Sequence, residues 1–230
     1  MSAEPNLFNL TMPVPMVFPN VFVARQFKKN GKPTGEPKFD AAFVFEPDSE
    51  DLKAMKALAI KAAKAKWPAR DIAADLKANN FTFPFSDGTK KADKRKNLGK
   101  EDGEYQRGKV VITGRSKFRP ALAILENGNC VDLTEETQIA AHKSKFYSGV
   151  ECLAQFNFQA FEGGNGPDGV NVYLNMVLST NRGKKIAGTS GGASAAATFS
   201  GYVGKASGED PTGGEDEGSD DPNAGLEGLI

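Results

Sequence analysis

Apolar and polar residues alternate most regularly between residues 150 and 178. In a predicted strand over 150–161, Phe156 and Phe158 share one face, and Asn157 and Gln159 share the other. After a glycine-rich turn, a second predicted strand repeats the pattern. Its apolar face carries Val170, Val172, Leu174, Met176 and Leu178, and its polar face carries Asn171, Tyr173 and Asn175. The two segments predict a long hairpin with one apolar and one polar face.

Shorter strands are predicted in the earlier part of the chain. Residues 7–25 predict an extended lead-in that becomes a strand around 21–23, where β-branched and aromatic residues cluster. Alternating apolar residues predict further strands over 39–45 and 109–118. A turn at 126–129 between two apolar runs predicts a hairpin.

A lysine-rich amphipathic helix is predicted between the first two of these strands and the rest. It begins after Asp48 or Ser49, either of which can cap it, and ends at Trp67-Pro68. Its apolar face carries Leu52, Met55, Leu58, Ala59 and Ala62, opposite a face of lysines. Residues 88–108 are polar, with almost nothing to bury, so they predict a long mobile loop.

The order of these elements predicts the class of fold. Short helices over 69–77 and 134–143 accompany at least five strands, all before about residue 187. A mainly β chain of this kind fits an OB-fold-like five-stranded barrel with a helical insertion. Hydrophobic residues make up 39% of the 230-residue chain, which is enough for a core and excludes a wholly disordered protein.

The composition changes after residue 187 and predicts three regions. Residues 1–187 form the folded domain, 188–208 a flexible linker of glycine, alanine and serine, and 209–230 a disordered acidic tail. Eight of the 29 acidic residues lie in the tail, which has no lysine or arginine. Residues 1–208 therefore carry 29 basic and 21 acidic residues, a net charge of +8 hidden by the overall neutrality.

The residues that most enzymes and metal sites require are missing. His142 is the only histidine, and Cys130 and Cys152 are the only cysteines, which argues against a Ser-His-Asp relay and against zinc. A nuclease would need Asp87, Asp93 and Asp102 to hold magnesium within the lysine-rich loop, an arrangement that we do not favour. We therefore expect no catalytic residues, no cofactor and no metal.

The sequence also bears on the compartment. No stretch approaches the roughly 18 apolar residues of a membrane span, and residues 1–5 lack the basic and apolar regions of a signal peptide. With so few cysteines, a reduced cytoplasmic compartment is the simpler expectation, and no membrane partner is expected.

Basic residues are concentrated between residues 88 and 119, where eleven of them face only four acids. On the predicted strand, Arg115, Lys117 and Arg119 share one face, at intervals of ~6.6–7 Å that resemble the phosphate spacing of an extended single strand. A solvated surface that aids solubility explains such a cluster equally well. Tyr105, Phe118 and Tyr147 lie near these cations and suit base stacking, although core packing is the alternative for each.

These considerations give a set of candidate nucleic-acid-binding residues. They are Lys94, Arg95, Lys96, Tyr105, Arg107, Lys109, Arg115, Lys117, Phe118, Arg119 and Tyr147. The acidic tail is either a solubilising segment or a competitor that folds back over the cationic surface and docks a partner with its apolar tip. The candidate partner-binding residues of the tail are Asp216, Glu217, Asp220, Asp221, Leu229 and Ile230.

Several short motifs resemble those of a known family. They are 83–88 (FPFSDG), 105–109 (YQRGK), 116–120 (SKFRP), 147–149 (YSG) and 169–175 (GVNVYLN). Together they resemble the tailed-phage single-stranded DNA-binding proteins, over roughly residues 14–186. The resemblance implies an OB-fold, sequence-independent binding of single strands, no catalysis, and a tail that contacts other replication proteins. It carries a binding role to Tyr105, Arg107, Lys109, Arg115, Lys117 and Arg119.

The hypothesis from the sequence is a single-stranded DNA-binding protein of phage replication or recombination, acting in the host-cell cytoplasm. Its partners would be single-stranded DNA and, through the tail, replication or recombination proteins. A virion structural or assembly protein with a solubilising tail is the alternative, and an annealing protein or nuclease is a third. The oligomeric state, including self-association, and the choice between DNA and RNA stay open.

Overall fold

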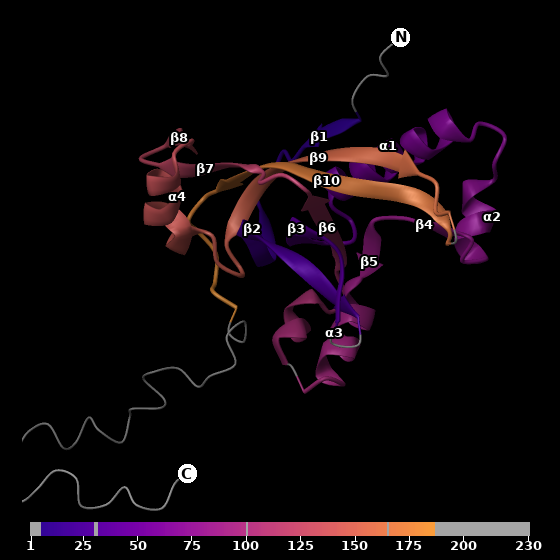
Figure 1. Cartoon of the computed structure of the whole chain (residues 1–230), viewed down its shortest axis with the longest axis horizontal. Coiled ribbons are helices and arrows are strands. Elements are labelled where there is room, and N and C mark those ends of the chain that lie inside the picture. The colour runs from indigo at the N-terminus through magenta and orange to yellow at the C-terminus, as the bar shows by residue number, and fades with distance from the viewer. Residues whose placement is uncertain (1–5, 30–31, 100, 165, 187–230) are drawn as a thin grey trace, which may run out of the picture. The chain divides into compact units, whose positions relative to one another are not determined.

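The computed structural model describes residues 6–29, 32–99, 101–164 and 166–186 (Figure 1). The tail residues named above, and the predicted linker, lie outside the described residues. Contacts divide the chain into residues 1–190 and 191–230, so everything described belongs to the first unit. No described helix has both the length and the apolar character needed to cross a bilayer.

The strands of the described residues form one sheet, in the order β5-β6-β3-β2-β9-β10-β7-β8. β1 pairs with β9, and β4 pairs with β10. The strands are β1 (Leu7–Asn9), β2 (Val14–Lys29), β3 (Lys32–Phe45), β4 (Phe81–Thr82), β5 (Phe85–Asp87), β6 (Val110–Ser116), β7 (Ala121–Glu126), β8 (Asn129–Leu133), β9 (Glu151–Phe161) and β10 (Asp168–Ser179).

Short helices occupy the connections. They are α1 (Glu50–Lys66), α2 (Ile72–Lys77), α3 (Gly88–Lys96) and α4 (Glu136–His142), with the 3-10 helices η1 (Glu101–Gln106) and η2 (Lys143–Lys145). α1 and α2 lie at one end of the long β9–β10 hairpin, and β7, β8 and α4 lie at the other (Figure 1). The predicted helices over 69–77 and 134–143 are present, although each is shorter than expected.

The five longest described strands close into a barrel. β2 pairs antiparallel with both β3 and β9, β3 pairs with β6, and β9 pairs with β10. β6 then returns to β10 at Gly114, where an added Cβ would lie 3.0 Å from the Cβ of Leu174. The absence of a side chain at Gly114 lets the two strands meet. The predicted OB-like barrel with a helical insertion is confirmed.

The long hairpin is confirmed in its faces and corrected at its end. Asn171 lies opposite Gln159, and Tyr173 lies opposite Asn157, on the polar face. A register shift between Leu174 and Met176 then reverses the alternation. The prediction that Met176 points inward is therefore wrong: its side chain is 50% exposed, and Val177 is buried instead.

Most of the described residues between 88 and 108 form α3 and η1 rather than a mobile loop. The Asp87 side chain caps α3 by accepting hydrogen bonds from the backbone N–H groups of Thr89 and Lys90. The segment packs through small residues, because Ala92 and Gly88 are buried and a Cβ on Gly88 would lie 1.9 Å from the carbonyl oxygen of Gln106. A search for large apolar residues could not detect packing of this kind.

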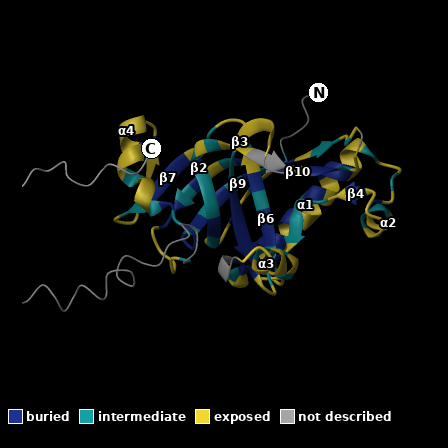
Figure 2. Ribbon diagram, turned by 60° about the horizontal axis from the view of Figure 1, so that its bottom comes forward, coloured by how far each residue is buried: buried dark blue, intermediate teal, exposed yellow. Residues whose placement is uncertain are grey.

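The core occupies the inside of the barrel, and part of the outside is also covered. Figure 2 shows buried residues along the central strands and exposed residues on α2, α3 and α4. Phe43, Phe45, Phe156 and Phe158 are the largest fully buried side chains. Alternate residues of β3, Ala42 and Val44, face the other way into a second cluster with Val17 and Val111. Cys152 is buried, Cys130 is exposed, and the two are not bridged.

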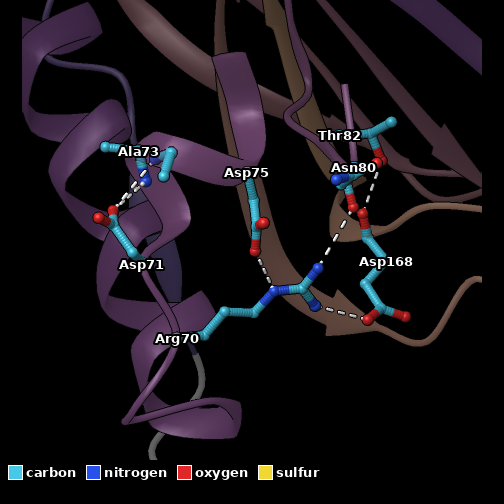
Figure 3. A network of polar contacts seen from close by, with 8 residues as sticks. Arg70, Asp71, Ala73, Asp75, Asn80, Thr82 and Asp168 are labelled. Carbon is cyan, nitrogen blue, oxygen red and sulfur yellow. Dashed lines mark hydrogen bonds and ion pairs between the residues drawn. The ribbon is translucent and has the colours of Figure 1, made fainter. Parts of the chain in front are cut away.

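Arg70 ties the helical insertion to the barrel (Figure 3). It lies between α1 and α2, pairs with Asp75, and donates hydrogen bonds to the carboxylate of Asp168 (2.6 Å) and the carbonyl oxygen of Asn80 (3.3 Å). The backbone N–H of Gly163 donates to the same Asp168 carboxylate at 2.9 Å. These two donors hold the pKa of Asp168 below its usual value.

Candidate nucleic-acid interface

A groove of about 740 Å³ lies on the polar side of the β9–β10 hairpin. Its lining comes from β3, the β4–β5 segment, α3, β6 with the residues after it, β9 and β10. The polar faces predicted from alternation supply its amides, since Asn157 and Gln159 lie opposite Tyr173 and Asn171 across the hairpin ladder. The barrel is what brings these distant segments together.

The charge of the groove has one sign. Among the described residues, Lys38, Lys91, Arg115 and Lys117 line it, and no acidic one does. Within the described part of the chain, only Lys117 of these four has an ion pair, with Glu36 at 2.5 Å. The groove therefore offers cationic groups whose counter-charge the described residues largely do not supply.

Three aromatic side chains line the same groove. Phe118 is 81% exposed, more than any other large apolar side chain in the described ranges, and Tyr173 is 37% exposed. Phe83 is half-buried, with its ring edge-to-face against Phe81 and Phe85. The sequence left Phe118 open between core packing and ligand stacking, and the structure places it outside the core. Exposed rings beside cations suit the stacking of unpaired bases.

Amide side chains complete the lining. Asn157, Gln159, Asn171 and Asn175 all line the groove. Asn175 donates to the side chain of Gln155 at 3.2 Å, whereas the other three have no side-chain hydrogen bond to any described residue. Each amide carries donors and acceptors that can serve base edges or sugars. The alternation pattern had placed these residues on one face without marking them as a site.

Lys91 is the groove cation with the most perturbed environment. It lies on α3, half-buried, with Nζ 3.4 Å from the Thr113 hydroxyl on β6. Burial, reinforced by the nearby charge of Arg115, lowers the pKa of Lys91 to about 8. Its neighbours in the basic cluster were chosen from the sequence and Lys91 was not, because the sequence does not show which lysine of α3 turns inward.

Of the eleven candidates from the sequence, the structure brings Arg115, Lys117 and Phe118 into the groove. Arg107 pairs instead with Asp93 (2.9 Å) and Glu104 (2.8 Å). The side chain of Lys109 reaches Glu46 at 3.0 Å. None of these contacts tests a role in binding, so the roles of Arg107 and Lys109 stay predictions.

The aromatic candidates Tyr105 and Tyr147 lie outside the groove lining. Tyr105 packs against the second apolar cluster, with the ammonium of Lys109 4.9 Å from its ring centroid. The Tyr147 hydroxyl donates to the carbonyl oxygen of Gly183 at 2.9 Å. Both rings therefore have structural contacts, and their binding roles stay predictions.

The remaining candidates lie on α3 and after β6. Lys94 and Lys96 are exposed on α3, and the guanidinium of Arg95 lies 4.2 Å from the ring centroid of Phe18. Arg119 was expected to continue the face of Arg115 and Lys117. Because β6 ends at Ser116, Arg119 instead pairs with Glu136 and donates to the carbonyl oxygen of Phe22.

Two of the three acidic residues considered for magnesium have structural contacts. Asp87 caps α3 and Asp93 pairs with Arg107. Within the described ranges, no three His, Cys, Asp or Glu side chains gather as a metal site.

An OB-like barrel with a cationic, aromatic groove is the architecture of single-stranded nucleic-acid-binding proteins. Residues 10–210 match the family described as "Enterobacter phage Enc34, ssDNA-binding protein". The chain belongs to this family, which confirms the resemblance noted from the motifs.

Solved structures agree on the fold. The single-stranded DNA-binding protein from bacteriophage Enc34 in complex with ssDNA is 17% identical, with a TM-score of 0.56, and the match covers 79% of this chain and 90% of that one. A second structure of the bacteriophage Enc34 protein is 18% identical, with a TM-score of 0.54, and the match covers 84% and 90%. Among curated proteins, none matches this chain in sequence.

Proposed function

We propose that this protein binds single-stranded DNA, without sequence preference, in phage replication or recombination in the host-cell cytoplasm. The observation that carries the proposal is the groove, to which the residues that the structure describes contribute four cations, three accessible or half-buried rings and no carboxylate. Membership of the Enc34 single-stranded DNA-binding family supports it. So does the related Enc34 protein, whose structure is a complex with ssDNA.

The groove supplies both contributions that such binding requires. Arg115 lies near the end of β6 and Lys117 directly after it, and both line the groove, so each can neutralise a phosphate of a strand that lies there. Phe118 and Tyr173 offer faces on which bases can stack. Stacking needs an unpaired base with a free face, so a duplex would gain the phosphate contacts alone. This difference is the proposed origin of single-strand preference.

We further propose that the acidic tail, residues 209–230, competes with DNA for the cationic groove and recruits replication or recombination proteins. The argument is charge complementarity between eight tail acids and residues 1–208, whose net charge is +8. Deletion of 209–230 should tighten binding at low salt, because an intramolecular competitor is removed. Binding by the truncated chain no tighter than that of the full chain would contradict this role.

The first experiment measures fluorescence anisotropy of a labelled oligo-dT of ~30 nucleotides at ~50 and ~300 mM salt. We expect tight binding that weakens with salt and that excess duplex does not displace. The virion-assembly alternative expects a stable oligomer and no preference for single strands. If neither the full chain nor the chain without 209–230 binds at low salt, the proposed function is wrong.

A further inference from the structure

Lys91 differs from the other groove cations in how it is held. Its ammonium group is half-buried between α3 and β6, and its one hydrogen bond within the described residues is a long one, 3.4 Å, to the Thr113 hydroxyl. No described carboxylate lies within ion-pair distance of it. Burying an ammonium group without a counter-charge costs folding free energy. The described residues thus hold a cation at the groove wall with one long hydrogen bond and no carboxylate partner.

The charged residues that line the groove with Lys91 are also cationic. The charged or titratable groups of the groove are Lys38 on β3, Arg115 and Lys117 on and after β6, and Tyr173 on β10. The other lining groups are hydroxyls, amides and apolar residues. Every charged neighbour in the groove therefore disfavours the ammonium form, and an anion entering the groove would favour it.

We propose that Lys91 is the phosphate anchor at the α3 wall of the groove and that binding of single-stranded DNA is coupled to protonation of its side chain. The inference rests on the proposed function, since the anion is the DNA backbone. The phosphate supplies the negative charge that the described residues near Lys91 do not. Where Lys91 is neutral, its amine takes one proton from solvent, and the resulting ammonium group pairs with one phosphate.

The pH dependence follows from the sign of the shift. The pKa of Lys91 is about 8 in the free protein, below its ordinary value of 10.5, because of burial first and Arg115 second. At pH 7 the side chain is charged, whereas at pH 9 it is roughly nine-tenths neutral and must take up a proton to bind. Coupling to this single group weakens binding by about tenfold between pH 7 and pH 9.

The same shift separates binding from folding. A lysine whose folded pKa lies below its unfolded pKa binds fewer protons when folded, so its charge destabilises the fold at pH 7. Replacement by an uncharged side chain of similar length should therefore raise the melting temperature while it weakens DNA binding. A merely structural lysine would lose stability on the same replacement.

The experiment compares the full chain with Lys91→Met, Lys91→Arg and Lys90→Met. Lys90→Met is the matched control, because Lys90 carries the same charge on the same helix but is exposed and does not line the groove. Oligo-dT affinity is measured by anisotropy from about pH 6.5 to pH 9.5 at fixed ionic strength. Calorimetry in buffers with different ionisation heats counts the protons taken up near pH 8.

We expect the wild type and Lys90→Met to lose about tenfold in affinity between pH 7 and pH 9 with proton uptake. Lys91→Met should bind about tenfold more weakly at pH 7 with a flat profile and a raised melting temperature. Lys91→Arg should bind tightly at both pH values, because arginine does not titrate there. Wild-type binding with no proton uptake, or an unchanged profile in Lys91→Met, would overturn the inference and leave the function intact. If the wild type does not bind oligo-dT at all, the proposed function itself is wrong.

Discussion

Two neighbouring stretches of the chain have similar basic compositions and differ in what surrounds their cations. In the segment formed by α3, η1 and Lys109, Arg107 pairs with Asp93 and Glu104, and Lys109 pairs with Glu46. In the next stretch, Arg115 lines the groove without an ion pair to a described residue. Phe118 projects beside it, 81% exposed.

The comparison shows why counting cations identifies a site poorly. The first stretch supplies most of the lysines and arginines, yet Arg107 joins α3 to η1 through its ion pairs, and Arg95 lies over the ring of Phe18 on β2. The second stretch supplies few, but the groove collects them beside rings and amides from β9 and β10. Which side of the barrel a cation faces and whether it already has a partner decide its availability. Lys91 belongs to the first stretch by sequence, but its side chain lines the groove together with the cations of the second stretch.

The largest expected effect comes from a pair of double variants. Arg115→Ala with Phe118→Ala removes one phosphate contact and one stacking platform, and should weaken oligo-dT binding by roughly 30- to 300-fold. Arg107→Ala with Lys109→Ala removes two charges from the paired stretch, one more than the first variant removes, and should still cost less than about threefold. Anisotropy at one salt concentration measures both. Equal losses would show that net charge, rather than the groove, governs binding.

A second change tests the structural role of the α3–η1 segment. Gly88→Ala places a Cβ 1.9 Å from the carbonyl oxygen of Gln106 and 2.7 Å from that of Lys109. Backbone must shift to relieve these contacts, so we expect a loss of about 1–3 kcal/mol in the free energy of unfolding, measured in urea. Gly166→Ala is the control, because its nearest contact would be an ordinary 3.7 Å. A neutral Gly88→Ala would contradict tight packing at this point.

A smaller effect distinguishes paired from available cations through salt. Each phosphate neutralised on a single strand contributes about 0.7 to the slope of log affinity against log salt. Arg115→Gln should lower the magnitude of the slope by about that amount, and Arg107→Gln should leave it unchanged. Titrations at four salt concentrations give the slopes. A reduced slope in Arg107→Gln would mean that its ion pairs open on binding.

Much of the barrel could be predicted from the sequence, because its hairpins have one apolar and one polar face. The pairs Phe156 with Asn157 and Val172 with Tyr173 alternate without interruption, so their faces followed directly. The alternation failed at Met176, where a bulge inserts one residue without any signal in side-chain type. Helix α3 was missed because its packing relies on Gly88 and Ala92 rather than on large apolar side chains.

The site was less predictable than the fold, for a topological reason. Arg115, Lys117 and Phe118 are close in sequence, so strand periodicity found them together. Lys38, Lys91 and Tyr173 reach the same groove from β3, α3 and β10, and only the closed barrel brings them there. Arg119 was wrongly assigned to the same face as Arg115 and Lys117. The prediction continued the two-residue repeat of a strand to residue 119, although β6 ends at Ser116.

The smallest expected effect concerns Arg70, a basic residue that is fully engaged like Arg107 but joins two parts of the fold. The pKa of Asp168 lies below its ordinary 3.8, because the Gly163 N–H and then the Arg70 guanidinium stabilise the carboxylate. A carboxyl with a lowered folded pKa stabilises the fold above its unfolded pKa, and that contribution is lost as the pH falls through the folded value.

Between about pH 5 and pH 2.5, the free energy of unfolding measured in urea should therefore fall slightly less for Asp168→Asn than for the wild type. Its oligo-dT binding at pH 7 should be unchanged, because Asp168 does not line the groove. The control is Asp132→Asn, an exposed carboxylate on β8, which should follow the wild-type curve. If the free energy of unfolding falls with pH identically in all three proteins, the Arg70–Asp168 ion pair adds nothing to stability. Weaker DNA binding by Asp168→Asn would show that the Arg70–Asp168 ion pair helps to position the residues that line the groove. Cations engaged in ion pairs could then contribute to binding indirectly.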